Sequence, residues 1–208
     1  MKKYLIFTDL DGTLLDHENY SYGNNKKTIT SIINNKNDVI FNTSKTFSES
    51  INLLKKLNLT NMPFSTENGA LLYFPKNRFK KIKNSSDYGK YWKIRIAKLS
   101  SKNWHQFLLK KQKKFKLLIA QDLPSKILKK YTNLDNTSKM LNREASQIIL
   151  WEDSLVNLKK FKNELKFEKQ GVLIQGGRFM QVSSVCNKRI AKKFISCLLY
   201  TSDAADDA

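Results

Sequence analysis

Residues 4–13, which read YLIFTDLDGT, form the stretch that decides the fold. Residues 4–8 are apolar, aromatic or β-branched and predict a short buried strand. Asp9 and Asp11 follow at the end of that strand, and Gly12 allows a turn that brings both carboxylates to one site. One carboxylate can attack a phosphorus atom while the other protonates the leaving oxygen and then deprotonates water. The alternative is an Asp- and Gly-rich turn with no function.

Segments of helix and strand character alternate after this stretch. We predict a helix over 26–35, a strand over 38–42, a helix over 47–57 and a strand over 70–74. This order indicates a parallel sheet with right-handed crossovers, in which ligands bind beyond the carboxyl ends of the strands. The polar segments 43–46 and 66–69 are therefore expected to converge with Asp9 and Asp11.

The composition changes after Pro75, and this change suggests the domain organisation. Residues 76–116 are rich in lysine and favour helix, and strands and helices then alternate to residue 182. We expect an α/β fold with a Rossmann-like parallel-sheet core and an inserted α+β domain. The predicted segments are 1–76 for the first part of the core, 77–184 for the insertion, 185–196 for the return to the core and 197–208 for a tail.

The charge of the chain is strongly positive, with 38 basic and 18 acidic residues among 208 and a net charge of +20. Arginine is the usual reader of bases and phosphates, yet 33 of the basic residues are lysine and only 5 are arginine. No arginine-rich or aromatic-interleaved stripe is present. Compositional bias therefore explains the charge better than nucleic-acid binding, which stays as an alternative from another functional class.

Targeting and redox signals are absent from the sequence. No apolar run approaches the roughly 20 residues that cross a bilayer, and the run after Met1 is too short for a signal peptide. Cys186 and Cys197 form no metal-binding or disulfide pattern. We expect a cytoplasmic protein that binds neither membrane nor nucleic acid, and the sequence does not fix its oligomeric state.

Several motifs together resemble one enzyme family. The Asp9-x-Asp11-x-Thr13 pattern after the first strand is similar to the first motif of the haloacid dehalogenase-like phosphatases. The closest resemblance within that superfamily is to the mannosyl-3-phosphoglycerate phosphatases, and it covers residues 4 to about 193. Its further motifs are Thr43-Ser-Lys-Thr46, Glu67-Asn-Gly-Ala70, Arg143-Glu-Ala-Ser146 and Gly176-Gly-Arg-Phe179. The resemblance implies that the insertion is a cap domain of the larger C2B type.

The resemblance also implies roles for individual residues. Asp9 would be the nucleophile that forms an aspartyl-phosphate, and Asp11 the general acid and base. Thr43 would hydrogen-bond the phosphoryl oxygens, although a threonine there can also be a helix N-cap. Lys188 would neutralise the phosphate, and it lies in Asn187-Lys188-Arg189 where the family has Asp-Lys-Gly. The side chains expected to hold a phosphorylated sugar-glycerate are Ser44, Lys45, Glu67, Asn68, Arg143, Ser146 and Arg178; turn residues or surface ion pairs are the alternative reading.

The expected cofactor is Mg²⁺, with Asp9 and Asp11 as its ligands. The family supplies its remaining ligands from an acidic fourth motif, which this sequence lacks after Lys188. Residues 197–208 instead resemble a translated sequencing adapter, so we expect a truncated core with a non-native tail and weak or no activity. A natural acidic tail that binds magnesium through Asp203, Asp206 and Asp207 is the alternative.

The sequence leaves two phosphatase functions open. The first expectation is hydrolysis of mannosyl-3-phosphoglycerate to mannosylglycerate, a compatible solute, and phosphate. The second is hydrolysis of another small phosphomonoester by the same chemistry, because a fold does not fix a substrate.

Overall fold

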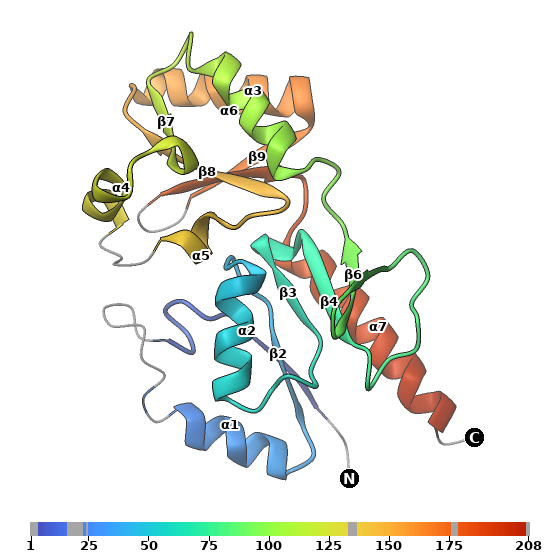
Figure 1. The fold of residues 1–208 in the computed structure, drawn as a ribbon. Helices are drawn as coiled ribbons and strands as arrows, with labels where there is room; N and C mark the ends of the chain where they lie inside the picture. The colour runs from blue at the N-terminus through green and yellow to red at the C-terminus, as the bar shows by residue number, and fades with distance from the viewer. Residues whose placement is uncertain (1–3, 16–22, 24, 133–136, 176–178, 207–208) are drawn as a thin grey trace. The chain divides into compact units, whose positions relative to one another are not determined.

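The computed structural model describes residues 4–15, 23, 25–132, 137–175 and 179–206, and the chain divides into two compact units (Figure 1). Unit 1 comprises Met1–Ile96 with Asn187–Ala208, and unit 2 comprises Ala97–Cys186. The elements of unit 1 are β1 (Leu5–Thr8), α1 (Asn25–Asn34), β2 (Asp38–Phe41), α2 (Phe47–Lys56), β3 (Phe64–Thr66), η1 (Glu67–Gly69), β4 (Leu71–Pro75), β5 (Ser86–Tyr88), β6 (Tyr91–Arg95) and α7 (Lys188–Asp206). Those of unit 2 are α3 (Ser101–Lys111), β7 (Leu117–Ile119), η2 (Ala120–Asp122), α4 (Ser125–Thr132), α5 (Ser138–Leu141), β8 (Ser146–Trp151), α6 (Leu155–Lys169), β9 (Gly171–Gln175) and β10 (Met180–Ser184).

The strands of unit 1 are parallel at one side and antiparallel at the other. β1 and β2 pair in parallel, and a parallel bridge between Asn42 and Ser65 joins the end of β2 to β3. β3 then begins an antiparallel sheet with the order β3-β4-β6-β5. The predicted parallel sheet is thus limited to the β1–β2–β3 side, because β4 turns back directly after η1 and pairs with β3.

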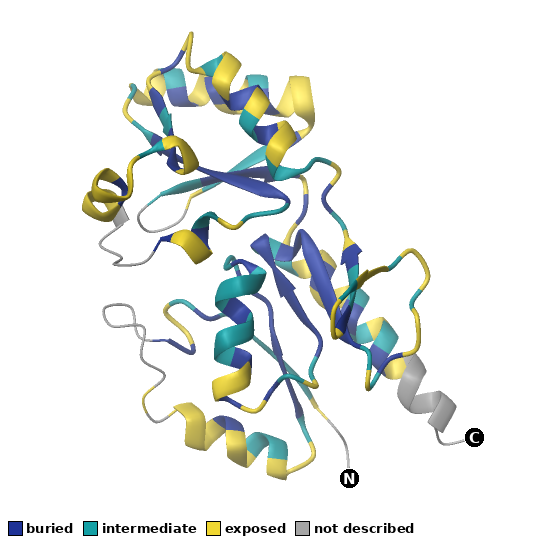
Figure 2. Ribbon diagram, viewed as in Figure 1, coloured by how far each residue is buried: buried dark blue, intermediate teal, exposed yellow. Residues whose placement is uncertain are grey.

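Both faces of β4 are buried, and the alternation of its side chains explains why. Leu72 and Phe74 belong to the core cluster that includes Ala191, Ile195 and Leu199 of α7. Tyr73, which points to the opposite face of the pleat, contacts the ring of Phe47 on α2. Figure 2 shows the resulting run of buried residues in β3 and β4. The strands that carry the polar loops are held between α2 on one face and α7 on the other.

The lysine-rich segment after Pro75 was predicted to favour helix, but its first part forms the strands β5 and β6. β6 pairs with β4 along the whole strand, from Leu71 opposite Arg95 to Pro75 opposite Tyr91, and β5 pairs with β6. Ile94 is buried in the core cluster beneath α7. Pairing with a buried strand overrides the local helix preference. The division between the units therefore falls after Ile96 rather than after residue 76.

Unit 2 is an antiparallel sheet, ordered β7-β8-β10-β9, with helices on both faces. Ile149 of β8 packs with Trp104 of α3 and Phe161 of α6 on one face. Ile148, its neighbour in sequence, packs on the other face with Leu128 of α4 and Met140 of α5. The α+β character expected for the insertion is present in this unit.

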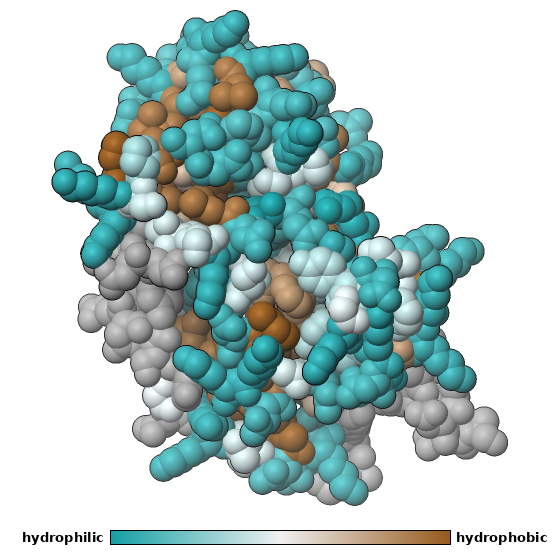
Figure 3. Space-filling view, viewed as in Figure 1, coloured by the Kyte–Doolittle hydropathy of each residue, from teal (hydrophilic) through white to brown (hydrophobic). Residues whose placement is uncertain are grey.

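Helix α7 extends to Asp206, past the predicted end near Ile195. Ala191, Ile195 and Leu199 recur at intervals of four residues and are all buried, which explains the continuation of an amphipathic helix. The described helices include none long and apolar enough to cross a membrane. Hydrophilic side chains cover most of the molecular face in Figure 3, in keeping with the high charge.

Candidate active site

The loop after β1 folds back on itself and fixes the two carboxylates at the end of the strand. The amide of Leu15 donates to the carbonyl oxygen of Leu10 at 2.8 Å, and the amide of Gly12 donates to the carbonyl of Leu15 at 3.0 Å. Gly12 adopts a φ of 68°, a left-handed conformation that glycine adopts without strain. Leu10 is fully buried, so it anchors the loop while Asp9 on one side and Asp11 on the other stay partly exposed.

Lys188 meets Asp9 at this site although 179 positions separate them in the sequence. The ammonium of Lys188 forms an ion pair with Oδ2 of Asp9, while Oδ1 accepts a hydrogen bond from the amide of Leu10 at 2.8 Å. The Asn42 side chain donates to the carbonyl oxygen of Lys188 at 2.8 Å and thereby ties the first residue of α7 to the end of β2. The Asp9 side chain remains 37% exposed, so a ligand can reach it.

The start of α7 explains how this chain manages without the family's Asp-Lys-Gly sequence. The Oδ1 atom of Asn187 accepts a hydrogen bond from the amide of Ile190 at 2.9 Å, which is the geometry of a helix N-cap. Arg189 is then an ordinary residue of the first helical turn, where a glycine is not required.

Lys45 places a second ammonium group against the second carboxylate. Its Nζ lies 2.8 Å from Oδ1 of Asp11 and 3.9 Å from Oε1 of Glu49. Lys45 directly precedes Thr46, the N-cap of α2, whose side chain forms a reciprocal capping box with Glu49. Thr46 rather than Thr43 therefore caps the helix, and the capped helix fixes the loop that carries Lys45.

The loops after β2 and β3 are tied together through their backbones. The amide of Thr43 donates to the carbonyl of Ser65 at 3.2 Å, and the carbonyl of Thr43 accepts from the amide of Asn68 at 2.9 Å. The amide of Glu67 donates to the carbonyl of Lys45 at 2.9 Å. Glu67 and Asn68 both adopt positive φ, at 49° and 60°, which turns the chain sharply here. The predicted convergence of these polar segments is thus present in unit 1.

Gly69 makes room for the start of α7. A Cβ atom at this position would lie 2.5 Å from the carbonyl oxygen of Asn187, and the φ of Gly69 is +85°. Only glycine allows the backbone of η1 to approach α7 this closely and in this conformation. Lys188 depends on that approach for its position beside Asp9.

The predicted residues Arg143 and Ser146 belong to unit 2. The Nη1 atom of Arg143 donates to Oγ of Ser146 at 3.2 Å, and Ser146 is fully buried. Arg178 lies outside the described residues. In unit 1, Ser44 is half-buried in the loop between Thr43 and Lys45. We call Asp9, Asp11, Thr43, Ser44, Lys45, Glu67, Asn68 and Lys188 the loop cluster.

Sequence reasoning missed the residues that hold the loop cluster together. Asn42 joins two of its loops, since its Oδ1 accepts from Oγ of Ser65 at 2.5 Å while its amide group binds Lys188. Gly69 and Asn187 position α7. A polar residue at the end of a buried strand was the available signal for Asn42, whereas the role of Gly69 depends on a segment more than a hundred residues away.

The oxygen atoms of Asp9 and Asp11 fit the expected magnesium ion in chemical type. Mg²⁺ prefers hard oxygen ligands, and proteins commonly hold it through one or two carboxylates together with substrate phosphate and water. The part of the chain that the structure describes holds no group of three acidic, histidine or cysteine side chains placed to bind a metal. Asp9 and Asp11 are the two carboxylates that follow β1 in the loop cluster.

Comparisons with known proteins identify the family of the chain. A family model described as haloacid dehalogenase-like hydrolase matches residues 6–196. The chain is 34% identical over 142 residues to a glucosyl-3-phosphoglycerate/mannosyl-3-phosphoglycerate phosphatase of Methanococcoides burtonii, which covers 67% of this chain and 52% of the relative. The chain thus spans about half the length of that curated relative.

Solved structures show the same fold at low sequence identity. A Thermoplasma acidophilum protein has a TM-score of 0.67 at 14% identity, covering 96% of this chain and 72% of its own. A haloacid dehalogenase-like hydrolase from Bacteroides thetaiotaomicron has a TM-score of 0.61 at 15% identity, covering 96% and 77%. The fold and the family expected from the motifs are confirmed, and the chain belongs to the haloacid dehalogenase-like hydrolases.

Proposed function

We propose that the chain carries the nucleophile and charge-neutralising groups of a phosphomonoester hydrolase. The observation that carries this proposal is the pairing of two neighbouring carboxylates with two lysines from separate segments, Asp9 with Lys188 and Asp11 with Lys45. Phosphoryl transfer depends on positioning and on neutralising phosphate charge more than on any other chemistry. A site with two carboxylates and two ammonium groups around one loop suits that task.

The reaction has two steps that use the same two carboxylates. A carboxylate oxygen of Asp9 bonds to phosphorus while the ester P–O bond breaks, and Asp11 gives a proton to the leaving oxygen. Asp11 then takes a proton from water as that water attacks phosphorus, which releases phosphate and frees Asp9. Lys188 and Lys45 hold the negative charge near the reacting group, and Thr43 contributes hydrogen bonds to the phosphoryl oxygens.

Magnesium, when bound by Asp9 and Asp11, would supply further positive charge at the phosphoryl group. The lysines supply charge from the chain itself, and Lys188 also keeps Asp9 oriented through its ion pair. These contributions are separable, because removing Mg²⁺ with a chelator leaves both lysines in place.

A phosphorylated sugar-glycerate is the substrate class that we favour. The 34% identity to a phosphatase named for glucosyl- and mannosyl-3-phosphoglycerate supports it. Arg143 and Arg178 would bind the glycerate carboxylate, because a guanidinium binds a carboxylate in a bidentate manner. The fully buried Ser146 would instead position Arg143 through their hydrogen bond. Another small sugar phosphate is the second candidate, supported by the limited coverage of that relative.

A substrate panel tests this proposal. Inorganic phosphate release is measured from mannosyl-3-phosphoglycerate, glucosyl-3-phosphoglycerate and several simple sugar phosphates with the 208-residue chain. We expect weak release that requires Mg²⁺ and Asp9, with the glycerate esters preferred. Release that survives Asp9→Asn, or no release from any substrate, would contradict the proposal.

A further inference from the structure

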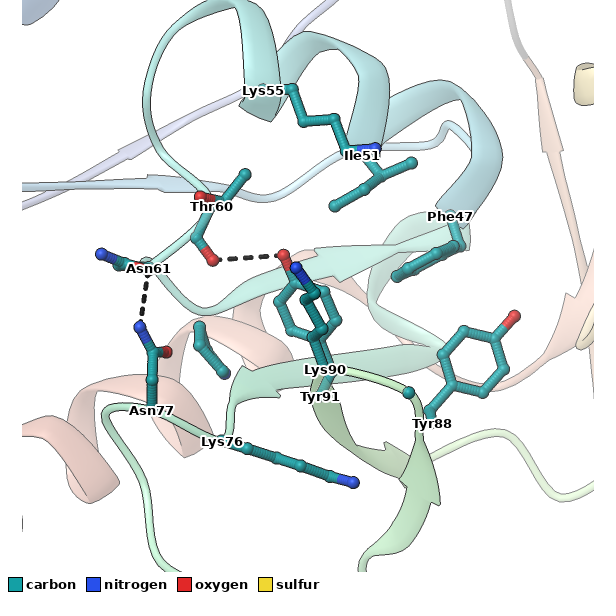
Figure 4. A pocket seen from close by; sticks show the side chains of 12 residues that line it. Phe47, Ile51, Lys55, Thr60, Asn61, Lys76, Asn77, Tyr88, Lys90 and Tyr91 are labelled. Carbon is teal, nitrogen blue, oxygen red and sulfur yellow. Dashed lines mark hydrogen bonds between the residues drawn. The ribbon is translucent and has the colours of Figure 1, made fainter.

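Unit 1 contains a second concave site, separate from the loop cluster, with a volume of about 900 Å³. It lies between α2, the turn at Thr60 and Asn61 that follows α2, and the segments at Lys76 and at Tyr88–Tyr91 (Figure 4). No side chain of the loop cluster lines it. The volume is in the range of small-molecule sites, which extends to about 1,000 Å³.

The floor of the cavity is apolar and aromatic. Phe47 and Ile51 reach it from α2, while Tyr88 and Tyr91 reach it from the β5–β6 hairpin. The ring of Phe47 lies 4.9 Å from that of Tyr88 and 5.9 Å from that of Tyr91, both edge to face. Aromatic rings pack favourably in this geometry, so a planar ring entering the cavity finds partners already arranged around it.

Hydrogen bonds fix the wall of the cavity before any ligand arrives. The hydroxyl of Tyr91 donates to the carbonyl of Thr60 at 3.1 Å, and the Asn77 side chain donates to Oδ1 of Asn61 at 2.8 Å. The first bond connects the turn after α2 to β6 and the second connects it to the turn after β4; both appear as dashed lines in Figure 4. A preformed wall lowers the ordering cost of binding.

The charged side chains that line the cavity are all lysines. Lys55, Lys76 and Lys90 line it, and no acidic side chain does so. Lys76 is committed elsewhere, since its Nζ lies 2.5 Å from Asp87 and 4.6 Å above the ring of Trp92. Lys55 and Lys90 are exposed and approach the cavity from opposite walls, α2 and the β5–β6 hairpin. An apolar floor beneath two ammonium groups is complementary to a flat apolar body that bears an anionic group.

We propose that this cavity binds a small aromatic anion, a planar ring that carries a phosphate, sulfonate or carboxylate group. The ring lies among Phe47, Tyr88 and Tyr91, and the anionic group lies between Lys55 and Lys90. This site is independent of the proposed hydrolase chemistry, because none of its residues belongs to the loop cluster.

Isothermal titration calorimetry with naphthalene-2-sulfonate tests the proposal, since a sulfonate is not a substrate for phosphate hydrolysis. We expect one molecule bound per chain in about 150 mM salt, where long-range attraction is screened. The double variant Lys55→Glu/Lys90→Glu should bind at least about 10-fold more weakly, because each reversal places a like charge beside the sulfonate. Ile51→Trp, which fills the cavity without changing charge, should weaken binding as well.

The matched control is Lys56→Glu/Lys83→Glu, which makes the same change in net charge at exposed positions that do not line the cavity. It should change the affinity less than about 3-fold, and butanesulfonate, which lacks a ring, should not bind measurably. All substituted positions are exposed or half-buried, and the urea midpoint of each variant verifies that it folds. No binding of the aromatic sulfonate, or an equal loss in the control, would overturn the proposal. Self-association that Lys55→Glu/Lys90→Glu abolishes would instead assign the cavity to a second copy.

Discussion

Two lysines of the loop cluster lie against carboxylates, whereas two lysines of the cavity line it together with aromatic side chains. Lys45 and Lys188 form ion pairs with Asp11 and Asp9. Lys55 and Lys90 line the cavity, and no acidic side chain lines it. Both sites belong to unit 1, and α2 contributes to each, through the loop before its N-terminus at one and through one side of the helix at the other.

The difference between these sites shows what a large net charge does not reveal. A lysine beside a carboxylate orients that carboxylate and can also bind an anion of higher charge. A lysine that lines an aromatic cavity would instead attract an anion to an apolar surface. The count of 33 lysines in the composition does not distinguish these two kinds of lysine. They are distinguished only by the side chains that the fold places beside each ammonium group.

The strongest test of the contrast removes the proposed nucleophile. Asp9→Asn should lower phosphate release from the best substrate by at least about 10³-fold, because an amide does not attack phosphorus. Asp87→Asn is the matched control, since this carboxylate pairs with Lys76 beside the cavity and takes no part in the loop cluster. Rates that fall equally in both variants would show that charge loss, not chemistry, explains the effect.

Replacing one lysine at each site with methionine compares the two sites directly. Lys45→Met should lower kcat/KM by about 10²-fold, because it removes a charge that neutralises the phosphoryl group. Lys55→Met, which replaces a lysine of α2 that lines the cavity, should change kcat/KM less than about 2-fold. Steady-state kinetics on both variants measures this ratio, and similar losses would mean that the two sites are not separate.

A pair of glycines compares the backbone at each site. Gly69→Ala should destabilise the fold by about 3 kcal/mol, since the new Cβ meets the Asn187 carbonyl in addition to the strain of positive φ. Gly89→Ala, in the wall of the cavity, has a φ of +61° but nothing within 4 Å, so only about 1 kcal/mol is expected. Urea denaturation followed by circular dichroism measures both, and equal losses would contradict the proposed close approach.

The smallest effect is expected at an ion-pair cluster in unit 2 that takes no part in the proposed chemistry. In unit 2 the Glu164 carboxylate binds Lys111 and Lys114, and hydrogen bonds from both lower its pKa. The stabilisation is therefore present above the unfolded pKa of Glu164 and is lost as the pH falls through its lower folded value. Glu164→Gln should lower the urea midpoint slightly at pH 7 and have no effect at a pH below that folded value. A difference that persists in acid would show that packing is responsible.

Local sequence signals predicted the elements around Asp9 and Thr43 because those signals are complete within a few residues. An apolar run followed by Asp-x-Asp-Gly indicates a strand and a turn without reference to the rest of the chain. Helix α2 likewise shows its apolar spacing and its capping residues in the sequence. The family and fold followed from these segments.

Contacts between distant residues were not predictable in the same way. Any of 33 lysines had the chemistry to meet Asp11, and the choice of Lys45 depends on how the loop after β2 is held. The segment of β6 was assigned helical character because residues 76–116 are rich in lysine, and its pairing with β4 supplies the missing information. The cavity also had no sequence signal, since it joins α2 to a hairpin that begins 30 residues after the helix.

The ion pairs of the loop cluster have a consequence for binding linkage. The ion pairs of Asp9 with Lys188 and of Asp11 with Lys45 are each formally neutral when the carboxylate is ionised. A phosphate monoester adds about −2 and Mg²⁺ adds +2, so the two together leave the net charge of the site unchanged, while either alone shifts it by two units in a half-buried site. Under the proposed function, each should therefore tighten the binding of the other by the same factor. The proposed site would in this sense be a receptor for a neutral metal–phosphate pair.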